Sequence, residues 1–141
     1  MTAAEKTFIK VETTVNTPLK KIWELWTVPE HIMQWNNASP DWHTPNAENN
    51  LIVGGIFNYR MEAKDGSFGF DFGGTYDVIM ADSRIEYTMG DGRKAIVEFI
   101  PDGNQTNITE TFESETENSL ELQKAGWQAI LDNFKKYAES K

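Results

Sequence analysis

Hydrophobic and polar side chains alternate through much of the chain between residues 51 and 115, and this pattern predicts a series of β-strands. Each apolar segment ends at a turn signal, and these signals are Asp65-Gly66, Ala81-Asp82, Gly90-Asp91-Gly92 and Asp102-Gly103. The length of a hairpin loop fixes which residues lie opposite each other. The turns therefore predict the register of an antiparallel sheet.

The predicted register gathers the large apolar side chains on one face of the sheet. The predicted pairs are Met61 with Phe70, Tyr59 with Phe72, Phe57 with Gly74, Val78 with Ile85, Tyr76 with Tyr87, Tyr87 with Ala95, Ile85 with Val97, Val97 with Ile108 and Ala95 with Glu110. The opposite face collects Asn58, Arg60, Glu62, Asp71, Thr75, Asp77, Arg84, Glu86, Lys94, Glu98, Thr109 and Glu113. We therefore expect one face toward a core and one toward water.

The segment before this sheet carries a strand and two short helices. Residues 7–15 alternate and predict a first strand. Thr17-Pro18 has the pattern of an N-cap followed by the first helical position, and Pro29 opens a second short helix. The polar stretch 36–50 is expected to be a loop.

A long amphipathic helix is predicted at the end of the chain, from about Ser119 to Ala138, with Asn118 and Glu121 at capping-box spacing. Its apolar stripe is Leu120, Trp127, Ile130, Leu131, Phe134 and Tyr137. An apolar sheet face needs a cover, and this helix is the only predicted element long enough to supply one. The expected fold class is therefore α+β, with a curved antiparallel sheet wrapped around the last helix.

Composition limits the classes of function. A length of 141 residues fits one domain over residues 1–141, and the absence of cysteine excludes disulfides and thiolate metal sites. A net charge of −9 without a basic stripe argues against nucleic-acid binding. Met1–Lys10 lacks the apolar region of a secretory signal, and no apolar run is long enough to insert in a membrane. We expect a cytoplasmic protein.

Several short motifs resemble the START-like, or SRPBCC, superfamily. Within it they resemble the family related to the activator of the heat-shock chaperone ATPase. The motifs are Thr17-Pro18 through Ile22-Trp23, Pro29-Glu30-His31 leading to Trp35, Gly54-Gly55 before Tyr59-Arg60-Met61, and Gly126-Trp127. A bacterial, polyketide-cyclase-like branch is resembled at Asp41-Trp42-His43, at 65–69 and at 126–131.

This resemblance covers nearly the whole chain and implies a helix-grip fold with an apolar cavity. It does not imply a single activity, because the superfamily includes lipid carriers, hormone receptors, cyclases and chaperone activators. The expected wall of the cavity combines the inward face of the sheet with the last helix. Its members are Phe57, Tyr59, Met61, Phe70, Phe72, Tyr76, Tyr87, Trp127, Ile130 and Phe134.

Glu110 is the most unusual residue on the predicted inner face, where it lies between Ile108 and Phe112. A buried carboxylate is costly without a partner, and Arg93 lies diagonal to it on the neighbouring strand. The two residues could form a polar anchor that orients a ligand hydroxyl or carboxylate. The alternative is that a bulge or a sheet end lets both side chains reach water.

His43, beside Trp42, could cap the mouth of the cavity or act as a general base. The alternative is a loop histidine with a structural hydrogen bond. Gly126 precedes Trp127 in mid-helix, where glycine is unfavourable, which indicates close packing or cavity space at that point. Gly73-Gly74 and Gly54-Gly55 lack the spacing of phosphate loops and predict bulges or bends in the sheet.

These features favour a protein that binds a small hydrophobic or aromatic ligand, as a monomer or a weak homodimer, without a cofactor or metal. One alternative is a co-chaperone-like activator with a heat-shock chaperone as partner, as the resemblance implies. Another is a cyclase- or hydrolase-like enzyme in which Glu110, Arg93 or His43 acts as an acid or base.

Overall fold

The structure is a computed structural model that describes residues 7–141, and it contains one curved sheet and three helices. In chain order the elements are β1 (Phe8–Val15), α1 (Leu19–Thr27), α2 (Pro29–Trp35), β2 (Trp42–Asn49), β3 (Ile56–Ala63), β4 (Gly69–Met80), β5 (Arg84–Met89), β6 (Lys94–Asp102), β7 (Gln105–Glu113) and α3 (Leu120–Glu139).

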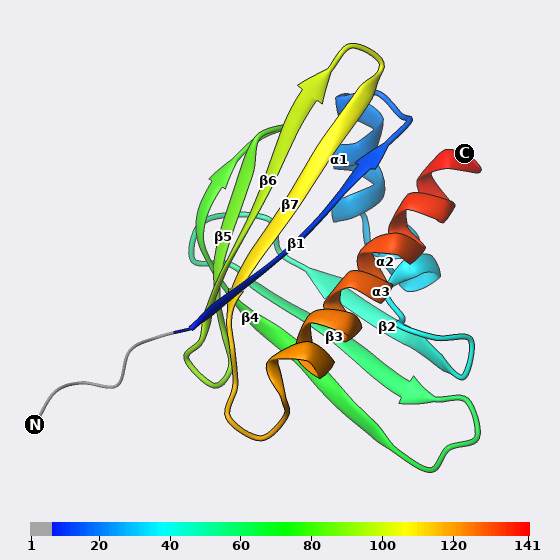
Figure 1. Cartoon of the computed structure of the whole chain (residues 1–141), viewed down its shortest axis with the longest axis vertical. Helices are drawn as coiled ribbons and strands as arrows, with labels where there is room; N and C mark the ends of the chain where they lie inside the picture. The colour runs from blue at the N-terminus through cyan, green and yellow to red at the C-terminus, as the bar shows by residue number, and fades with distance from the viewer. Residues whose placement is uncertain (1–6) are drawn as a thin grey trace, which may run out of the picture.

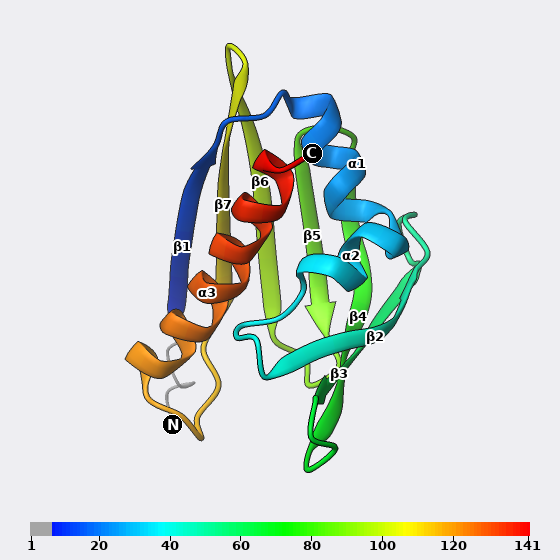
Figure 2. The ribbon, with the colours of Figure 1, turned by 90° about the vertical axis from the view of Figure 1, so that its right-hand side faces the viewer.

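All seven strands belong to one antiparallel sheet in the order β1-β7-β6-β5-β4-β3-β2. The sheet curls, and α3 lies across its concave side (Figure 1). A quarter turn shows α3 in front of the β1 side of the sheet, with α1 and α2 at the upper part of the other side (Figure 2). This is the helix-grip arrangement expected from the sequence.

Two of the four predicted hairpin registers are confirmed. β3 pairs with β4 as Tyr59 with Phe72, and β5 pairs with β6 as Tyr87 with Ala95. The three-residue loop Gly90–Gly92 is also present, because the Met89 amide donates to the Arg93 carbonyl.

The predicted β4–β5 turn is wrong by one residue. Its loop has three residues, with Met80 opposite Arg84 and Asp82 at a φ of 60°. A bulge between Tyr76 and Val78 absorbs the extra residue, so the predicted pairing of Tyr76 with Tyr87 is retained. Ile79, in place of Val78, therefore lies opposite Ile85.

The predicted β6–β7 register is also wrong. The turn lies one residue further along the chain, so Val97 faces Glu110 and Ala95 faces Phe112. Moving a turn by one residue displaces the opposite strand by two. Because side chains alternate with a period of two, Glu110 stays on the inner face.

The stretch 36–50 is not only a loop, because Trp42–Asn49 forms the edge strand β2. Its register shifts between His43 and Asn46, around Pro45. Proline has no amide hydrogen to donate, which restricts it to edges and irregular positions in sheets. This break hides the alternation by which strands are predicted.

The predicted helix starts need small corrections. Pro29 opens α2 as expected, but the N-cap of α1 is Pro18, and Thr17 instead accepts a hydrogen bond from the Thr106 hydroxyl through its carbonyl. The N-cap of α3 is Ser119, whose hydroxyl accepts from the Leu122 amide at 3.1 Å. Leu120 is therefore in the first turn of α3, and it is exposed.

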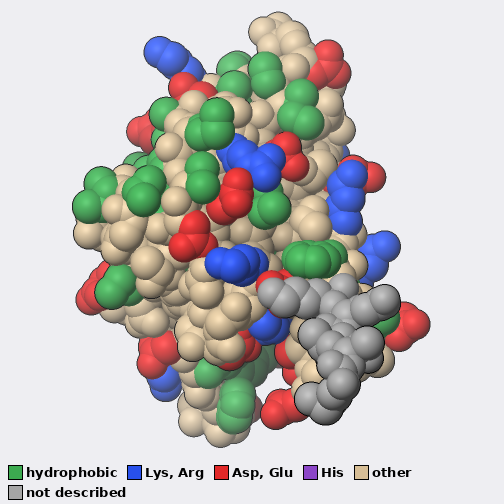
Figure 3. All heavy atoms as spheres, turned by 90° about the vertical axis from the view of Figure 1, so that its left-hand side faces the viewer, with side chains coloured by type: hydrophobic (Ala, Val, Ile, Leu, Met, Phe, Trp, Pro, Cys, Tyr) green, Lys and Arg blue, Asp and Glu red, His purple; other side chains and the backbone are tan. Residues whose placement is uncertain are grey.

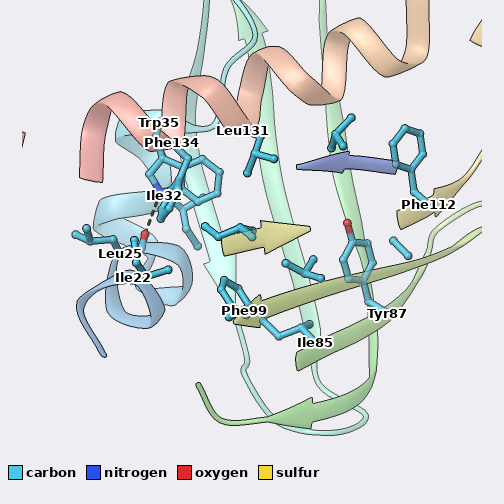
Figure 4. Close-up of a cluster of buried hydrophobic side chains, with 14 of the residues drawn as sticks. Ile22, Leu25, Ile32, Trp35, Ile85, Tyr87, Phe99, Phe112, Leu131 and Phe134 are labelled. Carbon is cyan, nitrogen blue, oxygen red and sulfur yellow. Dashed lines mark hydrogen bonds between the residues drawn. The ribbon is translucent and has the colours of Figure 1, made fainter. Parts of the chain in front are cut away.

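The main core lies between the concave face of the sheet and the three helices α1, α2 and α3. Phe134 and Leu131 of α3 are fully buried, and Phe134 packs edge-on against Trp35 at 4.9 Å (Figure 4). The indole of Trp35 donates to the Leu25 carbonyl at 2.9 Å. This cluster fixes α3 and both short helices to one another.

The convex face of the sheet carries neighbouring acidic and basic side chains (Figure 3). Arg60 bridges Glu62 and Asp71, and Arg84 bridges Glu86 and Glu98. The predicted solvated face is therefore present. Glu113 differs from the prediction, because it is buried while its carboxylate accepts from the Lys94 amide.

The pair Gly73-Gly74 sits inside β4 where another backbone comes close. A Cβ on Gly74 would lie 2.3 Å from the Thr88 carbonyl oxygen, and a Cβ on Gly73 would lie 2.6 Å from the Phe57 carbonyl oxygen. Pairing continues through both residues, so they provide a close approach without a bulge. Gly54-Gly55 instead belongs to the turn before β3, where Gly54 has a φ of 82°.

Gly74→Ala should therefore destabilise the protein by about 1–3 kcal/mol, because the new methyl group overlaps backbone atoms that cannot move aside cheaply. Gly126→Ala is the matched control. Its Cβ meets nothing within 4 Å, so it should stabilise α3 by about 0.5–1 kcal/mol. Urea unfolding measures both. A Gly74→Ala variant as stable as Gly126→Ala would contradict the close approach.

Candidate functional site

An interior cavity of about 270 Å³ lies between the concave face of the sheet and the helices. Aromatic side chains make up most of its wall. The lining residues are Trp26, Trp35, Asn36, Phe57, Tyr59, Met61, Phe70, Phe72, Tyr76, Ile85, Tyr87, Arg93, Val97, Glu110, Trp127 and Ile130. Each of the strands β3 to β7 contributes to this wall, as do all three helices.

Phe57 is the centre of the aromatic wall on the sheet. Its ring lies 5.0–5.8 Å from the rings of Tyr59, Phe72, Tyr76 and Tyr87. These tilted and edge-on contacts are the arrangements that aromatic rings prefer. The wall is therefore held in shape by its own ring contacts.

Trp127 closes the cavity from the side of α3. Its indole stacks on the ring of Phe112 at 3.8 Å and 11° and meets Phe72 edge-on at 6.0 Å. Phe112 is fully buried on β7, so the stack ties α3 to the sheet. Trp127 thus both anchors the helix and lines the cavity.

Glu110 extends from β7 into this apolar space with only 8% of its surface exposed. No other group within residues 7–141 hydrogen-bonds or pairs with its carboxyl. Every fully enclosed polar side-chain atom in the same range has a partner, so the unbonded carboxyl must border open cavity space. Burial raises the pKa of Glu110 to about 8.

The hydroxyl of Tyr87 extends from β5 toward the side of the sheet on which α3 lies (Figure 4). Burial raises the pKa of Tyr87 well above 10, and the nearby Glu110 carboxyl raises it further. Tyr87 therefore stays a neutral hydrogen-bond donor. Glu110 and Tyr87 together form a polar region in the otherwise apolar wall.

A second polar group in the wall is already satisfied by the protein. The Tyr59 hydroxyl hydrogen-bonds with that of Tyr76, and Tyr76 donates to Asn49 at 2.5 Å. Burial raises the pKa of Tyr76 to about 12. This series of hydrogen bonds connects Asn49, at the end of β2, to the cavity wall.

Arg93 lines the cavity as expected, but it does not pair with Glu110. Its Nε donates to Asp91 at 2.7 Å, and its Nη1 donates to the backbone carbonyl of Glu113 at 3.1 Å. The corrected β6–β7 register explains this result, because Arg93 is two residues further from Glu110 than the predicted turn implies. The expected ion-paired anchor is therefore wrong, although both residues line one cavity.

A shallower hollow of about 380 Å³ adjoins the cavity near the start of α3. The two share Met61, Phe70, Trp127 and Ile130. Gly126 lines the hollow and its missing Cβ faces open space, so the glycine marks room beside Trp127 rather than close packing. Phe70 is 41% exposed here, which makes this hollow the mouth of the cavity.

Two residues predicted at the cavity, His43 at its mouth and Phe134 in its wall, lie elsewhere. His43 is on β2, half exposed, with its Nε2 4.0 Å from a Glu62 oxygen, and neither hollow includes it. Its neighbour Trp42 lies at the mouth instead, because side chains alternate along a strand. Phe134 is fully buried in the core between Trp26 and Trp35 rather than on the cavity wall.

Residues 16–139 match the protein family described as Activator of Hsp90 ATPase homolog 1-like protein. The chain belongs to this family. No curated protein matches the sequence.

Solved structures agree with this assignment. The solution structure of the AHSA1-like protein from Aeromonas hydrophila is 43% identical over 95% of this chain and 93% of that chain, with a TM-score of 0.90. Chr148 from Cytophaga hutchinsonii is 52% identical over 94% of this chain and 92% of that chain, with a TM-score of 0.81. Protein NE0264 from Nitrosomonas europaea is 17% identical over 94% of both chains, and its TM-score of 0.80 shows the shared fold.

Some lining residues of this family member were not assigned from the sequence. They are Trp26, Trp35, Asn36, Ile85 and Val97. Ile85 and Val97 are on the predicted inner face, and their spacing could have placed them in the wall. The two tryptophans are not distinguishable from core residues by spacing alone, because the same helical stripe serves both roles.

Over the described range 7–141, no group of three or more histidine or acidic side chains is arranged to hold a metal ion. No helix in this range is long and apolar enough to span a membrane.

The raised pKa of Glu110 predicts a pH dependence of stability. Its pKa is about 8 in the folded protein against an ordinary value of 4.5, so the folded state binds more protons between these two values. Stability contributed by the protonated carboxyl is present below about pH 4.5 and is lost as pH rises through 8. Glu110→Gln removes this loss, because the amide cannot ionise.

We expect the urea midpoint of Glu110→Gln to be close to that of the wild type at pH 5 and clearly above it at pH 9. The difference in unfolding free energy should be on the order of a few kcal/mol. Glu86→Gln, which removes an outer-face partner of Arg84, is the control and should show no such divergence. If the difference in urea midpoint between the wild type and Glu110→Gln is the same at every pH, the pKa of Glu110 is not raised in the folded protein.

Proposed function

We propose that the protein binds a small, mostly apolar, aromatic ligand in the cavity between the sheet and α3. The observation that carries this proposal is an aromatic wall around about 270 Å³ of interior space. Protein interiors are normally close-packed, and voids larger than a water molecule are few. A cavity of this size with an aromatic wall therefore supports a ligand-binding role.

The dimensions support a ligand of one or two rings. An apolar cavity of about 150 Å³ accepts benzene, so a volume of about 270 Å³ leaves room for a bicyclic molecule. The wall offers ring faces and edges from Phe57, Tyr59, Phe72 and Trp127. Such a wall suits a flat ligand, because offset and edge-on ring contacts are favourable.

Access through the mouth supports reversible binding. Trp42, Phe70 and Leu122 surround the shallow hollow, and Phe70 and Leu122 are exposed. A ligand leaving water would meet these apolar side chains first. It would then reach Trp127 and Ile130, which line both the hollow and the cavity.

The family description makes activation of a chaperone ATPase the alternative function. A partner protein would have to contact the outside of the molecule, where ion pairs of Arg60 and Arg84 cover part of the convex face. An enzymatic role would need an acid–base pair, and within residues 7–141 the cavity wall contains one carboxyl, that of Glu110. Ligand binding, by contrast, accounts for both the interior volume and the aromatic wall of the cavity.

Ile130→Trp should abolish binding of a small bicyclic probe such as indane, because the larger ring occupies the cavity beside Trp127. Ile100→Trp, at an exposed position on β6, is the matched control and should bind indane as the wild type does. Calorimetric titration with indane measures both. We expect at least a tenfold loss of affinity for Ile130→Trp.

Equal affinities of Ile130→Trp, Ile100→Trp and the wild type would place indane outside the cavity. Mass spectrometry of protein purified directly from cells gives a second readout. A co-purified apolar compound should be present with the wild type and depleted with Ile130→Trp.

A further inference from the structure

Glu110 and Tyr87 lie diagonally across β6 on the inner face of the sheet. Tyr87 pairs with Ala95, and Glu110 pairs with Val97. The two intervening residues, Ala95 and Val97, carry no polar side chain. Both polar groups line the same cavity.

Neither group has a hydrogen-bond partner within residues 7–141. This situation is unusual, because a buried polar group without a hydrogen bond costs about 1–3 kcal/mol. Other polar groups of the wall are satisfied, as with Tyr59 and Tyr76. Among the carboxyl and hydroxyl groups of the wall, the exceptions are Glu110, with 8% of its surface exposed, and Tyr87, with 7%.

We propose that Glu110 and Tyr87 together hold the carbonyl oxygen of a neutral, ring-shaped ligand such as an aryl ketone. This inference rests on the proposed ligand-binding role of the cavity. An undissociated carboxyl and a phenol each donate one hydrogen bond, and a carbonyl oxygen has two lone pairs that accept both. The ring system then lies against the aromatic wall.

The charges around Glu110 favour a neutral ligand over a cation. A ligand cation would need an ionised carboxyl, whereas burial raises the pKa of Glu110 to about 8 and keeps it mostly protonated at neutral pH. Arg93 also lines the cavity, and its basic side chain offers no partner for a cation. The uncharged neighbours are Val11 on β1 and Val97 on β6, opposite Glu110.

The remaining elements in contact with the cavity add no further charge. α3 contributes Trp127 and Ile130, and β3 and β4 contribute the mutually bonded Tyr59 and Tyr76. Arg93 is also a poor partner for a ligand anion, because Asp91 already neutralises it at 2.7 Å. A neutral hydrogen-bond acceptor is therefore the ligand group that fits.

Three probes with one bicyclic frame test the inference. Indane is purely apolar, 1-indanone carries a carbonyl, and 1-aminoindane carries an ammonium group at neutral pH. Calorimetric titration of each probe at pH 6.5 gives the ratio of the Kd for indane to the Kd for 1-indanone, which is the carbonyl preference. The comparison between variants cancels the different hydration of the two probes.

We expect Glu110→Met to lower the carbonyl preference about tenfold while indane still binds, because the variant has lost a donor but kept an apolar side chain of similar length. Tyr87→Phe should lower it severalfold. Glu110→Gln should retain most of the preference, since its amide can donate. Glu86→Gln on the outer face is the control and should match the wild type.

The pH profile separates an acid from a general packing effect. In the wild type the carbonyl preference should decline as pH rises through about 8, where Glu110 ionises, and in Glu110→Gln it should stay constant. A different result would overturn the inference. If 1-aminoindane binds more tightly than 1-indanone at pH 6.5, Glu110 is ionised and binds a cation.

The outcomes distinguish this inference from the proposed function. If indane binds but Glu110→Met keeps the full carbonyl preference, the polar contact is wrong and the cavity still binds ligands. If none of the three probes binds to the wild type, ligand binding in the cavity fails and the carbonyl contact fails with it. A tenfold loss of the carbonyl preference in Glu110→Met and a severalfold loss in Tyr87→Phe, with indane binding retained in both variants, support both.

Discussion

Seven strands spaced about 4.8 Å apart form a sheet roughly 29 Å across, whereas one helix with its side chains is about 10–12 Å wide. The single long helix therefore cannot cover the concave face. Here α3 packs chiefly on β1, and the stack of Trp127 on Phe112 fixes it there. The inner face of β3 to β5 remains opposite open space. The cavity follows from this mismatch in width.

Contacts among aromatic side chains stabilise the cavity wall. The rings of Phe57, Tyr59, Phe72 and Tyr87 contact one another. The wall is therefore packed along the sheet, although no side chain fills the cavity that it faces. The close approach of backbones at Gly74 allows β4 to follow the curve of the sheet. Curvature, wall and cavity are thus parts of one arrangement. Glu110 is tolerated there because a protonated carboxyl is far cheaper to bury than a charged one.

The face of each strand could be predicted from the sequence, but the exact partners could not. Period-two alternation survives a shifted turn, so Glu110 was placed correctly on the inner face even though its partner is Val97 and not Ala95. The contact between Arg93 and Glu110 depended on that partner and was therefore wrong. The bulge after Tyr76 had the opposite effect, because it compensated for a turn that was one residue longer than expected. Errors in turn position thus affect pairwise contacts before they affect the fold.

The division between core and cavity wall could not be predicted from the sequence. Phe134 and Ile130 lie on one helical stripe, yet Phe134 fills the core against Trp35 and Ile130 lines the cavity. Hydrophobic spacing gives the direction of a side chain but not the distance to the opposite wall. His43 was misplaced because Pro45 conceals the strand on which it lies.

A crystal structure under xenon pressure tests the central claim most directly, since xenon enters apolar cavities without needing a specific contact. The account predicts xenon density between α3 and the inner face of β3 to β5, beside Phe57 and Ile130. An interior filled by side chains, with no xenon at that position, would contradict the account.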